Sequence, residues 1–226
     1  MIRTVQTEII TETIKKMCIE ANYSLSSDMV KAMRKAEEKE ESVLGKQILA
    51  QLQDNLEIAA SDMIPICQDT GMAVVFLEVG QDVHFEGGSF EDAVNEGVRR
   101  GYTEGFLRKS VVGDPILREN TKDNTPAVIH TRIVEGDRVK ITVAPKGFGS
   151  ENMSQIRMFK PSAGLQGIKD FILEVVETAG PNPCPPMVVG VGIGGTFEKC
   201  ALMAKEALTR EAGSHSEIPW VKDLEE

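Results

Sequence analysis

Ala73-Val74-Val75-Phe76-Leu77-Glu78-Val79 is the stretch at which the hydrophobic period of this chain changes from helical to strand-like. Its nearly continuous apolar side chains predict a buried β-strand. Just before it, Cys67-Gln68-Asp69-Thr70-Gly71 places a thiol, an amide, a carboxylate and a hydroxyl on consecutive residues. Because each buried polar group needs its own hydrogen-bond partner, this cluster favours a functional site over a packing core. A buried cysteine beside an Asp/Thr turn is the structural alternative.

The residues before this stretch carry apolar side chains at helical spacing, and residues 5–60 predict three helices. Cys18 lies on the core-facing stripe of the first, where we expect a small buried hydrophobic residue rather than a ligand. The third helix follows a predicted cap at Ser42. Its apolar stripe consists of Val43, Leu44, Ile48, Leu49, Leu52, Leu56 and Ala59.

The residues after this stretch mix strands with helices. Strands are expected at 127–134, 139–143 and 188–193, the first two joined through Glu135-Gly136-Asp137; helices are expected at 90–101, 165–179 and 197–208. The fold class is therefore α+β: an N-terminal helical bundle (1–62) followed by a mixed-sheet catalytic part with flanking helices (63–226). Residues 220–226 read as the first turns of a helix, so we expect a C-terminally truncated chain.

The length, the apolar runs and the net charge of the chain exclude several classes of function. A chain of 226 residues suffices for one large domain or two small ones, and no apolar run reaches the roughly 18 residues that span a bilayer. We expect a cytoplasmic protein, because no signal peptide is recognisable. The net charge of −10 argues against nucleic acid or an anionic membrane as a partner. With this net charge, a site for an anionic substrate must contain positively charged residues of its own.

Two further elements hold side chains suited to ligand binding. Cys184 stands in Asn182-Pro183-Cys184-Pro185-Pro186, and cysteines in proline-fixed turns are typical of ligands. Arg108 is suited to grip a carboxylate with two parallel hydrogen bonds, although a solvent-facing Arg-Lys pair is the plainer interpretation. The loop 146–152 can turn backbone N–H groups towards an anion, or it is a simple strand-to-helix turn capped by Ser150.

Other sequence patterns give weaker evidence of function. The four cysteines are too widely spaced for a disulfide framework or a zinc finger. The glycines of 190–195 satisfy Gly-x-Gly-x-x-Gly, but no second βαβ unit and no acidic ribose partner follow, so close backbone packing explains them better than a dinucleotide. The three histidines, His84, His130 and His215, form no pair at metal-ligand spacing.

Taken together, the motifs resemble a known family. They are Ile-Pro-Ile-Cys-Gln-Asp-Thr-Gly (64–71), Leu-Arg-Lys-Ser (107–110), Asp-Asn-Thr-Pro-Ala-Val-Ile-His (123–130), Lys-Gly-Phe-Gly-Ser-Glu-Asn (146–152), Asn-Pro-Cys-Pro-Pro (182–186) and Gly-Val-Gly-Ile-Gly-Gly-Thr (190–196). In this order they resemble the α subunit, or N-terminal domain, of the iron–sulfur hydro-lyases: class I fumarate hydratase and L-tartrate dehydratase. The resemblance extends over essentially the whole chain.

The resemblance implies a 4Fe–4S cluster held by three cysteines, with one iron left open as a Lewis acid for a four-carbon dicarboxylate. The implied reaction is the hydration of fumarate to malate, with L-tartrate dehydration as the alternative. By matching position, Cys67 and Cys184 are cluster ligands. The substrate-binding residues implied by the motifs are Gln68, Asp69, Thr70, Arg108 and Gly149, of which Asp69 and Arg108 are the catalytic candidates.

The sequence departs from the family pattern at two places. Phe148 replaces the middle glycine of Lys-Gly-Gly-Gly-Ser and would be strained if this position required a positive φ. The third cluster cysteine of the family lies in a further C-terminal segment, and Cys200 has no ligand counterpart. We therefore expect that the chain alone cannot assemble a complete cluster and that a β subunit supplies the catalytic base in a hetero-oligomer. A non-catalytic partner subunit is the alternative.

Overall fold

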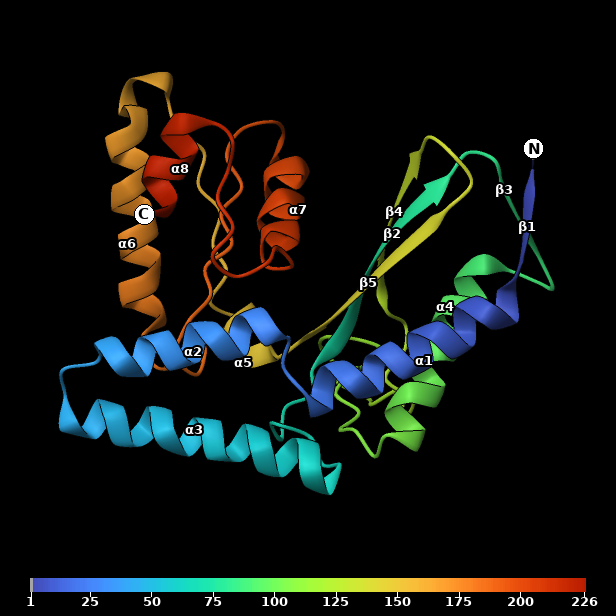
Figure 1. Cartoon of the computed structure of the whole chain (residues 1–226). Helices are drawn as coiled ribbons and strands as arrows, with labels where there is room; N and C mark the ends of the chain where they lie inside the picture. Colours follow the sequence, from blue (N-terminus) through green and yellow to red (C-terminus); the bar gives the residue numbers. More distant parts are fainter. Residues whose placement is uncertain (1) are drawn as a thin grey trace. The chain divides into compact units, whose positions relative to one another are not determined.

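The computed structural model describes residues 2–226, whose contacts separate into two compact units (Figure 1). Unit 1 comprises residues 2–25 and 47–148, and unit 2 comprises residues 26–46 and 149–226. Helices and mixed sheets together confirm the predicted α+β class. The division predicted after residue 62 separates the sequence by element type, and it stays a prediction.

Unit 1 is built on a three-stranded mixed sheet of order β4-β2-β5. The central strand β2 (Met72–Gly80) contains the stretch quoted first, and it runs parallel to β4 (Val128–Val134) and antiparallel to β5 (Val139–Lys146). A separate parallel pair joins β1 (Arg3–Gln6) to β3 (Val83–Glu86). This pair was not predicted, because strands of four residues are too short to show a clear period.

The link between β4 and β5 does not close a hairpin, because β2 lies between the two strands. Residues 135–138 instead cross the end of β2. A Cβ at Gly80 would lie 2.3 Å from the carbonyl oxygen of Gly136, so the crossing requires glycine there. The Gly80 N–H donates to the Arg138 carbonyl at 2.8 Å and holds the link in place.

Helices α1 (Thr7–Tyr23) and α4 (Phe90–Glu104) cover one face of this sheet (Figure 1). The two helices approach closely, since a Cβ at Gly101 would lie 2.8 Å from the Cβ of Cys18. Cys18 is fully buried, as predicted, and burial raises the pKa of its thiol to about 12. The core consists of Val5, Ile10, Ile14, Cys18, Tyr23, Ala73, Val75, Leu77, Val79, Val94, Val98, Tyr102 and Leu107.

The other predicted N-terminal helices are also present, as α2 (Ser27–Lys39) and α3 (Val43–Asp62). Ser42 caps α3 as predicted, because its hydroxyl accepts the Gly45 N–H at 3.3 Å. The apolar stripe of α3 is exposed at its N-terminal end, where Val43 is 74% and Leu44 65% exposed, whereas Leu49 and Ala59 are buried. None of the helices among residues 2–226 has the length and apolar character needed to cross a bilayer.

Unit 2 holds most of the remaining elements. Besides α2 these are α5 (Phe148–Glu151), whose first residue closes unit 1, η1 (Pro161–Ala163), α6 (Gly164–Ala179), α7 (Phe197–Ala207) and α8 (Pro219–Glu225). The strand predicted at 188–193 is wrong for the described residues: this segment is coil. A strand needs a neighbour to complete its backbone hydrogen bonds, and residues 2–226 provide none there.

Candidate functional site

The loop 67–71 is tied to the start of α5 by the carboxylate of Asp69. One carboxylate oxygen accepts the Gly71 N–H at 3.1 Å and the other accepts the Phe148 N–H at 3.0 Å. Asp69 therefore caps the start of α5. Gly71 has φ +62°, and a Cβ there would lie 2.2 Å from the Lys146 carbonyl oxygen, so no other residue fits.

Cys67 presents an exposed thiol at the edge of this loop. Its sulfur accepts the Asp69 N–H at 3.4 Å and donates to the side-chain carbonyl of Gln68, also at 3.4 Å. Backbone N–H groups directed at a cysteine sulfur are among the interactions that adjust iron–sulfur clusters. The predicted residues Cys67, Gln68 and Asp69 thus lie together, with the first two open to solvent.

Thr70 points into the protein instead of towards solvent. Its side chain is buried, and its hydroxyl donates to the Arg108 carbonyl at 3.0 Å. The Thr70 carbonyl in turn accepts the hydroxyl of Tyr102 at 2.8 Å. Burial raises the pKa of Tyr102, which keeps this phenol protonated as a donor. In this structure Thr70 fixes the backbone of Arg108.

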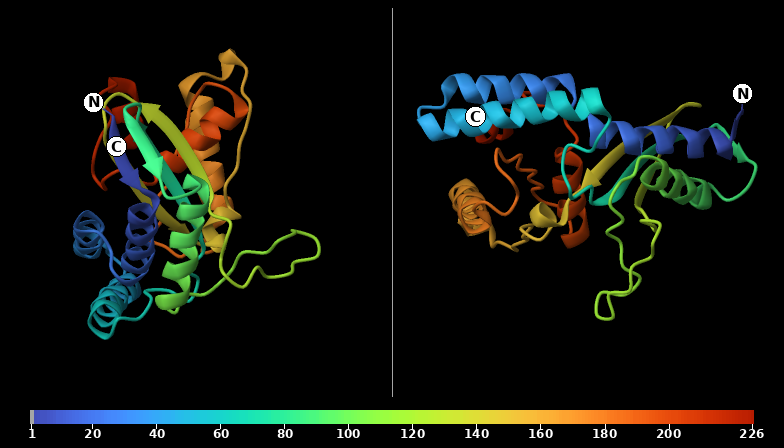
Figure 2. Two further views of the ribbon diagram at one scale, coloured as in Figure 1. Left: turned by 90° about the vertical axis from the view of Figure 1, so that its right-hand side faces the viewer. Right: turned by 90° about the horizontal axis from the view of Figure 1, so that it is seen from below.

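Arg108 follows the end of α4, at the start of a long loop that extends away from the helix (Figure 2). Its side chain is exposed and forms no ion pair with any residue that the structure describes. A guanidinium left without a carboxylate partner is available to bind an anion with two hydrogen bonds. In a protein of negative net charge, an anionic ligand requires a local cation of this kind.

Asn124 is the residue of the site that sequence reasoning missed. It is completely buried, and its side-chain oxygen accepts the N–H groups of Ser110 and Val111 at 2.7 and 3.2 Å. Its amide donates to the Gly71 carbonyl at 3.1 Å, which joins the Arg108 loop to the Cys67 loop. Its φ of +63° is one that asparagine tolerates better than most residues. The Asp-Asn-Thr-Pro motif, which is rich in turn-forming residues, was the available signal.

Asp123, beside Asn124, anchors the same loop to α4 through Arg99. Its carboxylate accepts the Thr125 N–H at 3.0 Å and an Arg99 N–H at 3.0 Å. Burial alone would raise the pKa of Asp123, but these hydrogen bonds and the Arg99 charge outweigh it and hold the pKa at about 2. The loop that bears Arg108 is therefore fixed at both ends.

In unit 2, Cys184 lies at the end of a tight turn. Its N–H donates to the Pro181 carbonyl at 3.1 Å, and its thiol is exposed. Its φ is +58°, a conformation that costs free energy in a residue other than glycine and that concentrates at functional sites. A Cβ at Gly149 would lie 2.9 Å from the Asn182 carbonyl oxygen, so the predicted loop residue Gly149 borders the turn that holds Cys184.

Phe148 has no positive φ, and the strain anticipated at this position does not arise. It is the first residue of α5, and its N–H is held by Asp69. Cys200 is half-buried, and its thiol donates to the carbonyl of Phe197 one turn earlier at 3.3 Å.

The thiols of Cys67 and Cys184 each suit thiolate ligation, because both are exposed, lie on fixed turns and fill no core. No group of three or more Cys, His, Asp or Glu side chains placed to hold a metal ion occurs among residues 2–226. Each of the two cysteines therefore has the donor chemistry of an iron–sulfur cluster ligand. The described residues place no third ligand beside them.

The glycines of 190–195 serve packing. A Cβ at Gly190 would lie 2.2 Å from the Ala204 carbonyl oxygen, and one at Gly192 would lie 2.0 Å from the Cys200 carbonyl oxygen. Because no strand precedes these glycines, the strand–loop–helix setting of a dinucleotide fingerprint is not present in residues 2–226. The backbone-packing interpretation agrees with these contacts.

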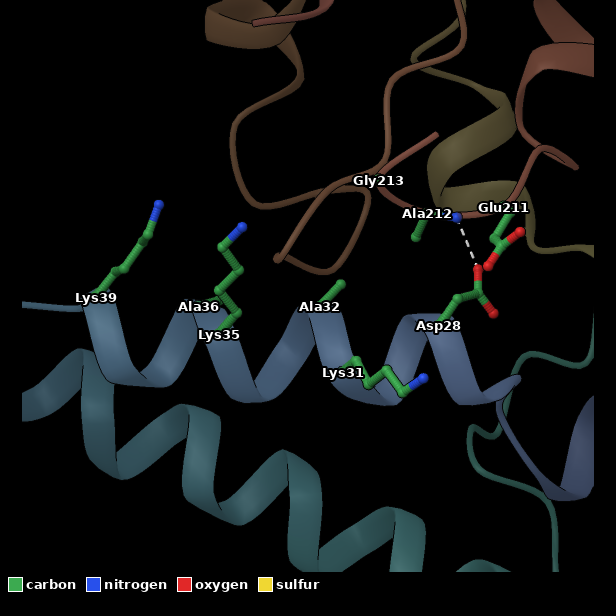
Figure 3. Close-up of a pocket in the computed structure, with 9 residues that line it drawn as sticks. All are labelled: Asp28, Lys31, Ala32, Lys35, Ala36, Lys39, Glu211, Ala212 and Gly213. Atoms are coloured by element: carbon green, nitrogen blue, oxygen red, sulfur yellow. Dashed lines mark hydrogen bonds between the residues drawn. The ribbon is translucent and has the colours of Figure 1, made fainter. Parts of the chain in front are cut away.

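Unit 2 also contains a cavity of about 450 Å³ between α2 and the loop 211–213 (Figure 3). The Ala212 N–H donates to the Asp28 carboxylate at 2.7 Å across one end, and the side chains of Lys35 and Lys39 rise from α2 at the other. None of the predicted site residues lines this cavity.

Comparison with known proteins places the chain in a family. The profile of the family described as fumarate hydratase (Fumerase) matches residues 11–226. A protein of Methanocaldococcus jannaschii, provisionally named L(+)-tartrate dehydratase subunit alpha, is 38% identical over 222 residues, which cover 96% of this chain and 78% of that protein. The L(+)-tartrate dehydratase subunit alpha of Escherichia coli K12 is 28% identical over 219 residues, or 96% of this chain and 72% of that subunit. The chain belongs to the fumarate hydratase (Fumerase) family of hydro-lyases.

Proposed function

We propose that this chain is the α subunit of an iron–sulfur hydro-lyase that interconverts fumarate and L-malate. Hydration adds hydroxide to one carbon of the double bond and a proton to the other, and dehydration reverses both steps. The observation that carries the proposal is the network of Asp69, Thr70 and Asn124, which fixes an exposed thiol and an unpaired arginine on adjoining loops.

Cys67 and Cys184 are the proposed ligands of a 4Fe–4S cluster, and a third thiolate is required besides them. When bound, the cluster supplies an open iron that acts as a Lewis acid towards hydroxyl and carboxylate oxygens. The N–H of Asp69 directed at the Cys67 sulfur supports this role, because hydrogen bonds to the cysteine sulfurs are among the interactions that adjust such clusters.

The remaining predicted residues bind and orient the substrate. Arg108 grips one substrate carboxylate, and the side-chain amide of Gln68 donates a further hydrogen bond to the substrate. Asp69 contacts the substrate while its two oxygens keep the loop against α5. Thr70 is a positioning residue, since its hydroxyl holds the Arg108 backbone. The N–H of Gly149 is proposed as a further donor to the substrate.

L-Tartrate is the second candidate substrate, because the two relatives described above are named as tartrate dehydratase α subunits. Loss of water from L-tartrate gives oxaloacetate through its enol. The two candidates are separated by kcat/KM on L-malate and on L-tartrate, measured anaerobically with the chain co-expressed with its β subunit. A ratio in favour of malate supports the fumarate hydratase proposal, and a ratio in favour of tartrate replaces it.

The ligand roles are tested by iron and sulfide content after anaerobic reconstitution of the α–β complex. Cys67→Ser and Cys184→Ser are each expected to lose the cluster, because serine is a poor ligand for iron–sulfur centres. Cys200→Ser is the matched control and is expected to retain it. A cluster that persists in either of the first two variants, or disappears in the control, contradicts the assignment.

A further inference from the structure

The segment 187–193 has the composition of a β-strand but no neighbouring strand among residues 2–226. Its sequence is Met187-Val188-Val189-Gly190-Val191-Gly192-Ile193. It contains no helix, turn or bend, and none of its residues has a positive φ. None of its N–H or C=O groups bonds to a residue that the structure describes. Backbone groups left open along an extended segment are a template for another strand.

One face of this segment is already covered by a helix. Gly190 and Gly192, two positions apart like residues on one face of a strand, both meet backbone carbonyls of α7. Glycine permits this contact, since Cβ atoms there would lie 2.2 and 2.0 Å from the carbonyl oxygens of Ala204 and Cys200. The segment thus rests on α7 as a sheet strand rests on its covering helix.

The other face and both edges are open. Val189 and Val191 alternate with the two glycines and remain 49% and 37% exposed. β-Branched residues in an almost unbroken apolar run are typical of the central strand of a sheet buried on both faces. A central strand needs neighbouring strands, and residues 2–226 provide none.

The relatives indicate which polypeptide supplies the neighbouring strand. The match leaves more than a fifth of the M. jannaschii protein and more than a quarter of the E. coli subunit outside the shared stretch. Hydro-lyase α polypeptides of this family thus contain additional residues that can complete a sheet. A covalently joined segment is also favoured over a separate chain, because its effective concentration is higher.

We propose that the segment 187–193 accepts a neighbouring β-strand. This strand comes from the part of the α polypeptide that these relatives have outside the shared stretch. Backbone hydrogen bonds to the added strand would satisfy the open groups, and its side chains would cover Val189 and Val191. Met187 follows Cys184 after the Pro185–Pro186 pair, so the added strand would border the loop that bears this thiol. The proposal is independent of the substrate.

The test is amide hydrogen exchange of residues 187–193 in the full chain and in a chimaera. The chimaera joins this chain, at the corresponding end of the shared stretch, to the unmatched part of the M. jannaschii protein; a second carries a scrambled version of that part. Exchange in the segment is expected to slow roughly tenfold or more in the first chimaera only. Equal exchange in both chimaeras overturns the proposal.

Proline variants show whether the protection comes from strand pairing. Val188→Pro and Val189→Pro remove N–H groups that point to opposite edges, so at least one should abolish the protection, while Val188→Ala and Val189→Ala should keep it. Exchange in β2 reports in every variant that unit 1 remains folded. Protection that persists in both proline variants contradicts the proposal. So does protection that arises in the chain alone with rising concentration, or on addition of the β subunit alone, because the occupant is then a second copy or the partner.

Discussion

The two units of the molecule differ most in how much apolar surface they bury. Unit 1 contains nearly all of the buried hydrophobic residues, gathered between β2, α1 and α4. In unit 2 the buried hydrophobic residues are Met33 and Ala179, while Leu173, Phe197 and Trp220 on its helices are 61%, 61% and 44% exposed. Unit 1 therefore has a core of its own, whereas unit 2 has amphipathic elements whose apolar faces are only partly covered by residues 2–226.

This difference has a consequence for the proposed cluster ligands, since Cys67 belongs to unit 1 and Cys184 to unit 2. The Cys67 loop is held by buried hydrogen bonds of Thr70 and Asn124. The Cys184 turn has local contacts, namely the bond from the Cys184 N–H to the Pro181 carbonyl and the approach of Gly149 to Asn182. A site in such surroundings gains most of its stability from what binds to it.

The largest expected effect tests the contrast in burial directly. Leu77→Ala removes a fully buried side chain from β2 and should lower the free energy of unfolding by about 3 kcal/mol, through lost transfer energy and the remaining cavity. Leu173→Ala on α6 should change it by less than about 0.5 kcal/mol, because that side chain is largely exposed. Both are measured by denaturant unfolding of the whole chain. Equal losses would remove the distinction between the units.

The next effect concerns the polar framework of unit 1. Asn124→Ala leaves two N–H groups and one carbonyl buried without partners and should cost about 2 kcal/mol in the free energy of unfolding. Asn120→Ala is the matched control, since Asn120 also bonds to backbone but is exposed, and it should cost well under half as much. A small loss for Asn124→Ala would mean that the Arg108 loop is fixed by other contacts.

A third variant tests the packing contact in unit 2. Gly192→Ala places a methyl group against the Cys200 carbonyl and should separate the segment 187–193 from α7, at a cost of about 1–2 kcal/mol. Faster amide exchange in α7, with unchanged exchange in β2, is the expected signature. Gly113→Ala has no atom nearer than 3.9 Å to the added methyl group and should alter neither helix nor strand. Unchanged exchange in α7 would show that this contact contributes little.

The smallest effect is a pH dependence in unit 1. Asp123 has a folded pKa of about 2, below its unfolded value of 3.8, so its contribution is complete above the unfolded value and is lost as pH falls towards the folded value. After allowance for solvent screening this contribution is about 1 kcal/mol. Unfolding free energies of the wild type and Asp123→Asn should converge between about pH 4 and pH 2. A constant difference across this range would contradict the assignment.

The secondary structure of unit 1 followed from the sequence because its patterns are local. The apolar run 73–79 formed β2, and the helical spacing before it formed α1. The pairing was not predicted: residues 135–137 join β4 to β5 in sequence, yet β2 lies between these two strands in the sheet. Hydrophobic period specifies which residues form a strand but not which strand is its neighbour. The network around Asn124 was missed for a related reason, since its partners lie 13 to 53 residues away.

Sequence by itself determined the family, the α+β class and the identity of Cys67, Arg108 and Cys184 as candidates. Motifs and hydrophobic periods are properties of short stretches of neighbouring residues, so they can be recognised without the fold. Only the tertiary structure decided that Asp69 caps α5, that Thr70 turns inward to hold Arg108, and that the β-like run 187–193 stands without a partner. Hydrogen bonding and burial depend on residues far apart in the chain, and these become neighbours only when it folds.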